Sequence, residues 1–322
     1  MFSQNFTQFS LGDKFYNYHN PSYVASEGIT NVKALHRSQW THYQHDEIIN
    51  PRPLTQLVTF EHPISFFSKS VSSKKTEALG LSILNDNIGI VNQISLDLAL
   101  AKKVMLSETK KVAFGLSFGI LSQRIKNSSL TYVEENDPTI QSFINSGTIM
   151  EPTISAGVRY EGSKSNVGFA IKNLIANDNK GFLISQKTLL LDFKTRFSLS
   201  SMLDIIPLIH IASDFKTQSY LMGSNFRFSL FDMLLDFNVL SRHSFVNSES
   251  RSLLWTNNDM ILQLGIPSIP RLALGFYYSL DVVTFGKAAK SALSHEFMMI
   301  YQFDKKKHYK EKQLFSPRYK YN

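Results

Sequence analysis

The sequence contains no cysteine, which excludes a disulfide framework and every metal site that depends on thiolate ligands. It contains no run of about 18 apolar residues, so no segment is suited to cross a bilayer as a helix. A glycine-rich phosphate-binding loop with its lysine and serine or threonine is also missing. These absences exclude thiolate metal sites, helical membrane proteins and P-loop nucleotide hydrolysis.

Most of the chain has a net charge close to zero. The formal net charge is +8, and residues 304–322 account for +5 of it. A basic body would indicate nucleic-acid binding, whereas a basic tail is a weaker signal that fits either a solvated end or a docking segment. We therefore expect no nucleic-acid partner.

What the sequence has in abundance is alternation of large apolar residues with small or polar ones. The clearest case is the stretch from Lys111 to Ser122, where large residues such as Phe114 and Phe118 alternate with small ones such as Gly115 and Ser117. A helix would scatter these apolar side chains around its circumference. A strand with one large and one small face fits a barrel wall with lipid outside and a crowded lumen inside. A soluble β-sandwich, with the apolar face in its core, is the alternative.

Alternation of this kind recurs along the chain and predicts fourteen strands. They are 29–41, 53–62, 77–85, 91–102, 111–122, 151–160, 166–174, 186–199, 204–213, 219–228, 233–242, 253–265, 271–283 and 291–303. An even number places both termini on the periplasmic side of a bacterial barrel. Most of the connections expected on that side are short, whereas those expected outside, such as 127–148, are longer. Connections 64–76 and 86–90 are exceptions. Another of the longer outer connections is 243–252. Aromatic residues cluster in the last two strands, and we expect them, Tyr277 among them, near the membrane interfaces.

We predict an all-β, transmembrane antiparallel β-barrel in three parts. Residues 1–28 form an N-terminal periplasmic or lumenal segment, residues 29–303 the barrel, and residues 304–322 a basic periplasmic tail. The last strand, 294–303, should pair with 29–41 so that no edge is left in lipid. Small lumen residues such as Gly115, Gly119 and Gly275 either leave space or accommodate the N-terminal segment. The first residues lack the basic and apolar parts of a signal peptide, so we expect that it has been removed.

Catalytic chemistry has little support in the sequence. Ser294, His295 and Glu296 are adjacent, but neighbouring strand residues point to opposite faces and do not form a triad. The histidines His36, His42 and His45 lack convincing metal-ligand spacing. We predict a non-enzymatic protein with no catalytic residue, no cofactor and no metal.

An ordered set of short motifs resembles the PorP/SprF family of type IX secretion system outer-membrane proteins from Bacteroidetes. The residues that carry the resemblance are Asn20, Pro21, Arg37, Gln39, Trp40, Asn85, Asp86, Gly89, Asp137, Pro138, His295, Glu296 and Phe303. Each motif alone is weak, but together they follow the family's order over nearly the whole chain. One departure is Ser38, which stands where the family usually has asparagine.

The resemblance implies an outer-membrane protein that supports export or surface anchoring of a cargo, such as a gliding-motility adhesin with a type IX C-terminal signal. The implied partners are that cargo, outer-membrane lipid, and the periplasmic ring lipoproteins and peptidoglycan-binding components of the system. Candidate tail contacts to these periplasmic partners are Lys305, Lys306, Lys307, Lys310, Lys312 and Arg318. A passive channel or small-molecule transporter is one alternative, and a soluble β-protein that binds ligands in a cup is another.

Overall fold

The computed structural model describes residues 9–41, 52–65, 76–88, 91–125, 147–175, 187–230, 233–247, 253–269, 272–284 and 292–303. Its strands are β1 (Asn31–Ser38), β2 (Leu54–Ile64), β3 (Glu77–Ile88), β4 (Val91–Met105), β5 (Lys111–Ile125), β6 (Thr148–Glu161), β7 (Ser165–Lys172), β8 (Thr188–Thr195), β9 (Phe197–Ser198), β10 (Leu203–Ser213), β11 (Thr217–Leu230), β12 (Met233–Asn247), β13 (Leu253–Ile266), β14 (Leu274–Thr284) and β15 (Ala292–Gln302). Three short helices precede β1, namely η1 (Ser10–Lys14), α1 (Tyr16–His19) and η2 (Pro21–Tyr23).

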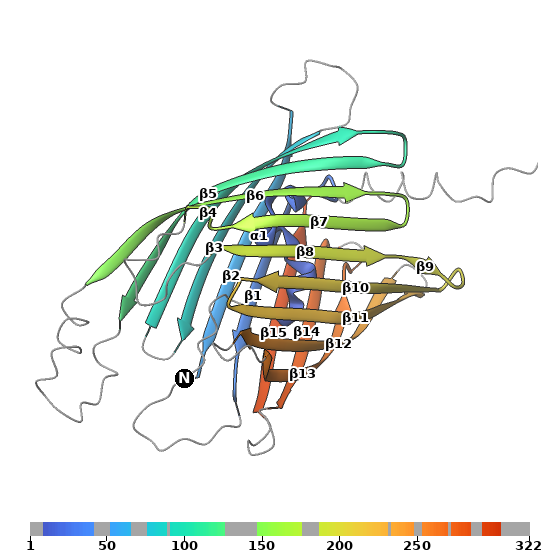
Figure 1. Ribbon diagram of the computed structural model, residues 1–322. Helices are drawn as coiled ribbons and strands as arrows, with labels where there is room; N and C mark the ends of the chain where they lie inside the picture. The colour runs from blue at the N-terminus through green and yellow to red at the C-terminus, as the bar shows by residue number, and fades with distance from the viewer. Residues whose placement is uncertain are drawn as a thin grey trace, which may run out of the picture.

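The strands form one closed antiparallel barrel in which neighbours in sequence are neighbours in space (Figure 1). The predicted closure is confirmed, because β1 pairs with β15 from Asn31 opposite Gln302 to Ser38 opposite His295. The prediction of a fourteen-stranded barrel is confirmed as well, since β8 and β9 are two parts of a single strand.

The break between β8 and β9 lies opposite a proline. Both parts pair with β10 in the same register, as Leu208 opposite Lys194 and Ile205 opposite Phe197 show. Pro207 stands in the gap of that ladder, where it has no N–H to donate. The split therefore interrupts the hydrogen bonding locally and leaves the barrel closed.

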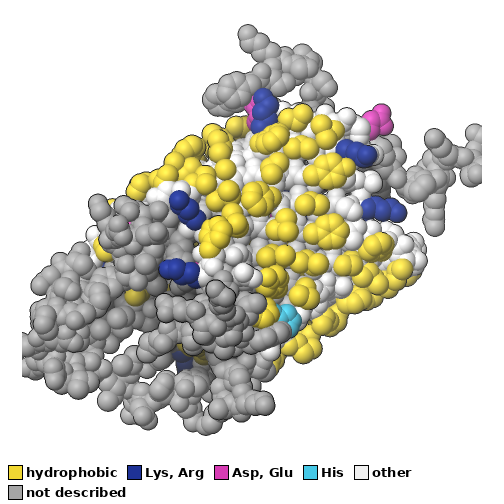
Figure 2. Space-filling model, viewed as in Figure 1, with side chains coloured by type: hydrophobic (Ala, Val, Ile, Leu, Met, Phe, Trp, Pro, Cys, Tyr) yellow, Lys and Arg dark blue, Asp and Glu magenta, His cyan; other side chains and the backbone are white. Residues whose placement is uncertain are grey.

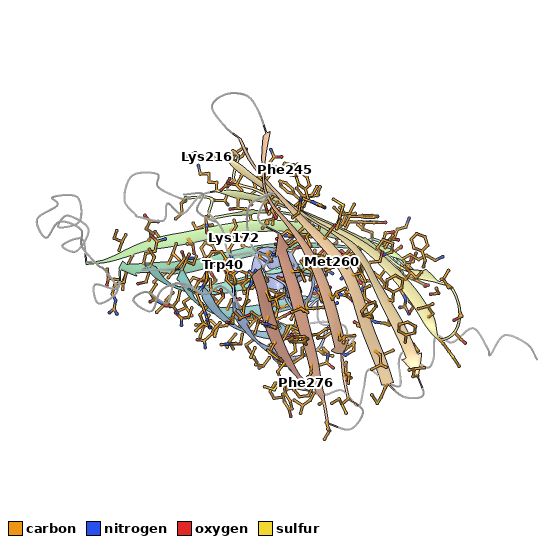
Figure 3. The ribbon with its side chains drawn as sticks, turned by 90° about the horizontal axis from the view of Figure 1, so that it is seen from below. Trp40, Lys172, Lys216, Phe245, Met260 and Phe276 are labelled. Atoms are coloured by element: carbon orange, nitrogen blue, oxygen red, sulfur yellow. The ribbon has the colours of Figure 1, made fainter. Side chains whose placement is uncertain are left out.

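The outer face of the wall is apolar, as the alternation predicts. Phe114 and Phe118 are 54% and 51% exposed, whereas Ala113 on the other face is 2% exposed. Figure 2 shows apolar side chains covering the visible outer surface, with the lysines and arginines mainly near its edges. Seen from below, Met260 and Phe276 project away from the lumen (Figure 3). This surface matches the lipid-facing belt of a membrane barrel.

Some details of the sequence interpretation were wrong. We expected Tyr277 near a membrane interface, but it faces the lumen and is buried, with its hydroxyl donating to Asp236 at 2.8 Å. Side chains alternate between the two faces of β14. Even-numbered residues such as Phe276 point outward, so Tyr277 points into the lumen. The predicted connection beginning at His243 is also too long, since β12 continues to Asn247.

Residues 9–28, which we call the plug, lie inside the ring of strands (Figure 1). Most of their side chains are buried, among them Leu11 and Phe15 with no exposed surface. None of the helices in the described ranges is long and apolar enough to cross a bilayer. Gly28, with φ of 73°, turns the chain from the plug toward β1.

Candidate functional site

The first described part of the plug is held by every polar atom of Ser10. Its N–H donates to Glu296 Oε1 at 2.7 Å, and the N–H of Leu11 donates to Glu296 Oε2 at 2.8 Å. Its carbonyl accepts from Gln263 Nε2 at 2.6 Å. Its hydroxyl donates to Asp281 and accepts from Arg242 Nη2 at 3.0 Å. We call these wall residues, together with Arg37, the Ser10 latch.

The latch is a buried charge network. Arg37 Nε lies 3.0 Å from Glu296 Oε1, and Arg242 Nη1 lies 3.2 Å from Asp259 Oδ2. Asp281 lies 3.8 Å from both guanidinium groups. Three carboxylates therefore face two guanidinium groups, and the two plug N–H groups at Glu296 supply further positive partial charge. Buried ions need hydrogen-bond partners to be tolerated, and Ser10 and Leu11 of the plug supply several of them, so the latch depends on the plug being in place.

A second charged group holds the plug at Lys14. Its Nζ lies 2.6 Å from Asp13 Oδ2 and 3.9 Å from Asp236 Oδ2. Asp236 also accepts from both Nε and Nη2 of Arg227, at 2.7 and 2.8 Å. Such a bidentate pair fixes the carboxylate in one orientation, so that Lys14 meets a preformed acceptor on the wall.

Apolar packing adds to these polar contacts. Phe9, Leu11 and Phe15 join one buried cluster with wall residues of β1, β2, β3, β14 and β15. The wall members are Leu35, Leu57, Leu84, Tyr277, Met298 and Ile300. Burial of each large apolar side chain is worth roughly 1.5–3 kcal/mol. The first half of the plug is thus anchored by a small hydrophobic core as well as by the latch.

The second half of the plug sits against glycines of the wall, which we call the glycine seat. A methyl group added at Gly115 would overlap the backbone of Pro21 and Ser22, and one added at Gly157 would overlap the Asn20 amide. Asn20 itself caps η2, because its Oδ1 accepts from the N–H of Ser22 at 3.0 Å and from its hydroxyl at 2.6 Å. The wall therefore lacks side chains where the plug backbone comes closest.

The plug also meets cationic side chains of β4, β6, β7 and β8. Lys172 Nζ lies 3.3 Å from the centroid of the Tyr18 ring, and the Arg159 guanidinium lies 4.7 Å from that of Tyr23. Lys103 Nζ donates to the carbonyls of Ala25 and Ser26, at 2.5 and 3.3 Å. Cation–π contacts and charged donors thus hold the aromatic half of the plug.

The charge state of His19 in the plug depends on docking. Burial lowers the pKa of its imidazole well below the usual value, and His210 and Lys172 lower it further. The His210 ring lies 5.5 Å from the His19 ring and contacts Asp192 at 3.3 Å. His19 is therefore neutral when the plug is docked.

The structure brings several of the sequence-predicted residues together. Arg37 and Glu296 pair in the latch, and Gln39 accepts from Arg37 Nη2 at 2.6 Å with its amide oxygen turned toward the guanidinium. Asn20 and Pro21 occupy the glycine seat. The family-like motifs at the two ends of the chain therefore meet in the plugged lumen.

Other predicted residues lie apart from the plug contacts. Asp86 accepts from Thr55 on the lumen side, whereas Asn85 and His295 lie on the outer face, where His295 contacts the Tyr278 hydroxyl. Trp40 follows β1 with φ of 54°. The N–H of Phe303 donates to Thr30 just beyond the closing seam. Outside the described residues lie Gly89, Asp137, Pro138 and the tail residues Lys305, Lys306, Lys307, Lys310, Lys312 and Arg318.

Sequence reasoning missed Ser10, Arg242, Asp259, Gln263 and Asp281. A signal was present for the four wall residues, because each of them is polar and shares the parity of the small, lumen-facing residues of its strand. A charge at such a position requires a partner inside the barrel. The missing information was which partner, since Ser10 lies more than 200 residues away from each of its latch contacts.

A closed barrel with an apolar outer belt and a charged, plugged lumen defines an outer-membrane type of β-barrel protein. Within that class, the family described as type IX secretion system membrane protein PorP/SprF matches residues 2–301, and the chain belongs to this family. The resemblance seen in the sequence is thereby confirmed. No curated protein matches the chain.

Solved structures with a similar fold are membrane barrels. The CymD monoaromatic hydrocarbon channel is 10% identical, with 92% of this chain and 94% of that chain covered and a TM-score of 0.56. The Ralstonia pickettii toluene transporter TbuX is 8% identical, with 89% and 92% covered and a TM-score of 0.49. A Pseudomonas aeruginosa FadL homologue is 8% identical, with 88% and 91% covered and a TM-score of 0.46. At 10% identity the likeness to CymD concerns the fold alone.

Proposed function

We propose that the protein is a closed, non-enzymatic barrel of the type IX secretion system that supports export or surface anchoring of a cargo with a type IX C-terminal signal. Membership of the PorP/SprF family is the observation that carries this proposal. The plug favours a scaffold over a conduit, because buried ion pairs and apolar packing hold it inside the lumen.

The proposed orientation places the end of β1 outside the cell and both termini in the periplasm. At the opposite end of the barrel, large apolar residues such as Leu106, Leu199 and Leu272 are exposed at the turns themselves. Where β1 ends, several outward-facing residues are polar instead, for example Gln56, Asn85 and Arg124, beside exposed apolar residues such as Met150 and Phe215. A wall that stays apolar to its turns on one side and is more polar on the other, over β2, β3 and β5, fits short periplasmic turns and strands that extend beyond the membrane outside.

The proposed partners are the cargo at the outer end and, in the periplasm, the ring lipoproteins and peptidoglycan-binding components of the system. The excess of positive charge in residues 304–322 supports the tail as the periplasmic contact, because seven lysines and arginines face two acidic residues there. On this proposal Lys305, Lys306, Lys307, Lys310, Lys312 and Arg318 bind acidic surfaces.

Co-purification from the native membrane tests this function. The tagged full chain should retain a protein with a type IX C-terminal domain and periplasmic components of the system. Replacement of these six of the seven tail cations by glutamine should release the periplasmic components and leave the cargo bound, while the same number of substitutions at other exposed lysines should release neither. Recovery of the barrel with no component of the system would refute the proposal.

A further inference from the structure

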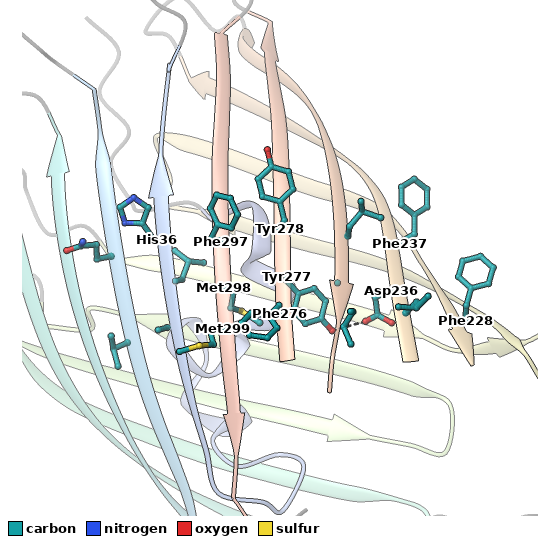
Figure 4. A pocket seen from close by; sticks show the side chains of 18 residues that line it. His36, Phe228, Asp236, Phe237, Phe276, Tyr277, Tyr278, Phe297, Met298 and Met299 are labelled. Carbon is teal, nitrogen blue, oxygen red and sulfur yellow. Dashed lines mark hydrogen bonds between the residues drawn. The ribbon is translucent and has the colours of Figure 1, made fainter. Parts of the chain in front are cut away.

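A long hollow crosses the outer face of the wall from β2 to β11 (Figure 4). Its volume is about 1150 Å³. Figure 4 shows two rows of outward side chains along it, with His36, Phe297 and Tyr278 in one row and Met299 and Phe276 in the next. The strand register gives the same rows, since His36 is opposite Phe297 and Phe297 is opposite Tyr278.

The hollow is apolar along most of its length. Phe297, Met299 and Phe276 are 59%, 46% and 44% exposed. Ala34 stands between Val58 and Met299 in the register, and its methyl group leaves a gap that larger neighbours frame. Because this face lies in the apolar belt of a membrane barrel, the groups that enter the hollow are hydrocarbon chains.

Polar groups gather at one end of the hollow, on β1 and β2. His36 and Gln56 line this end. From Gln56 a row of side-chain amides continues over the neighbouring strands, because Asn85 Nδ2 donates to Gln56 at 3.3 Å and Asn92 Nδ2 donates to Asn85 at 2.8 Å. Next to Asn92 in the register stands Arg124, which is exposed on β5. The outer wall thus presents an apolar hollow, then amides, then a cation.

We propose that this surface binds an acylated, phosphorylated saccharide lipid of the lipid A class. Acyl chains fill the hollow, sugar hydroxyls meet His36 and the amide row, and a phosphate meets Arg124. From β1 to β5 there are four strand spacings, or roughly 19 Å. The head group of a glycerophospholipid is too short for that distance, whereas a phosphorylated disaccharide covers most of it and the long side chain of Arg124 covers the rest. The proposal rests on the outward direction of β1 given above.

The test compares two substitutions of equal size on the outer face. Ala34→Trp fills the hollow, whereas Ala156→Trp adds the same ring on β6, where Ala156 is opposite the lipid-facing Leu116 and lies outside the hollow. The purified full chain in detergent is incubated with lipid A or with phosphatidylglycerol, and bound lipid is counted by native mass spectrometry. Wild type and Ala156→Trp should retain one lipid A, Ala34→Trp should bind it at least 10-fold more weakly, and Arg124→Gln should weaken it several-fold.

Three outcomes would overturn the site. Wild type would retain no lipid A, or Ala34→Trp and Ala156→Trp would bind it equally, or phosphatidylglycerol would be retained as well as lipid A. The last result would reduce the hollow to an ordinary membrane contact. The assay contains no other component of the secretion system, so its failure would leave the cargo proposal standing.

Discussion

At the scale of single residues, Glu296 is the side chain on which the plug contacts converge. It is fully buried, accepts two plug N–H groups and pairs with Arg37. Glu296→Gln keeps the shape but leaves Arg37 without its closest counter-charge and puts an amide donor against the plug donors. We expect a loss of about 3–5 kcal/mol of stability, as for other broken buried ion pairs.

Thermal or urea unfolding followed by circular dichroism measures this loss. Glu108→Gln is the control, because Glu108 is exposed in the turn between β4 and β5. A surface substitution of this kind changes stability by less than about 0.5 kcal/mol. Equal effects of the two substitutions would show that the latch does not stabilise the barrel.

Gly115 makes a second prediction at this scale. A methyl group there overlaps the backbone of Pro21 and Ser22, and backbone atoms cannot move aside by a change of side-chain rotamer. Gly115→Ala should cost roughly 1–3 kcal/mol through overpacking, and it should make the plug more sensitive to protease. At Gly162 the nearest atom lies 3.5 Å from an added methyl, so Gly162→Ala should change neither quantity. An unperturbed Gly115→Ala protein would mean that the plug does not occupy the seat.

At the scale of elements, the plug should respond to pH through His19. Docking lowers the pKa of this imidazole. Below about pH 6.5 the undocked state therefore binds a proton that the docked state does not bind. Docking is therefore weakened as pH falls, by up to about 2 kcal/mol between pH 6.5 and 5. Above pH 7 this contribution is fully favourable and constant.

Protease accessibility of residues 9–28 between pH 5 and 8 measures that dependence. His19→Gln removes the titrating group and should flatten the profile in this range, whatever its effect on absolute stability. A profile that keeps its slope in His19→Gln would assign the pH response to other groups, such as the neighbouring His210.

The strands and the plug differ in how far the sequence alone predicts them. Strands such as β5 follow from alternation, because lipid contacts every second side chain of Lys111–Ile125 and nothing else is required. The plug helices have three to five residues each and leave no periodicity. Their positions depend on contacts such as Ser10 with Glu296, which are 286 residues apart. A buried tyrosine such as Tyr277 was misplaced because composition does not distinguish a lumen hydroxyl from an interfacial one.

At the scale of the whole molecule, the plug in the lumen leads to a prediction about ion conductance. If the barrel is a scaffold, the full chain in a planar bilayer should show no steady conductance. Deletion of residues 9–28 should open a stable pore, because the lumen-facing residues that remain, among them Arg242, Asp281 and Glu296, are charged and attract water. Deletion of residues 304–322 retains residues 9–28 and should leave the barrel closed.

Gly115→Ala provides a folded intermediate case if the plug deletion fails to assemble. In this variant the plug is displaced from the glycine seat. It should therefore show brief openings that wild type lacks, at the same voltage and salt concentration. A wild-type chain that conducts steadily and selects among solutes would instead favour the passive channel. Conductance therefore distinguishes a scaffold from a passive channel without knowledge of the cargo, because it reports whether residues 9–28 stay docked in the lumen.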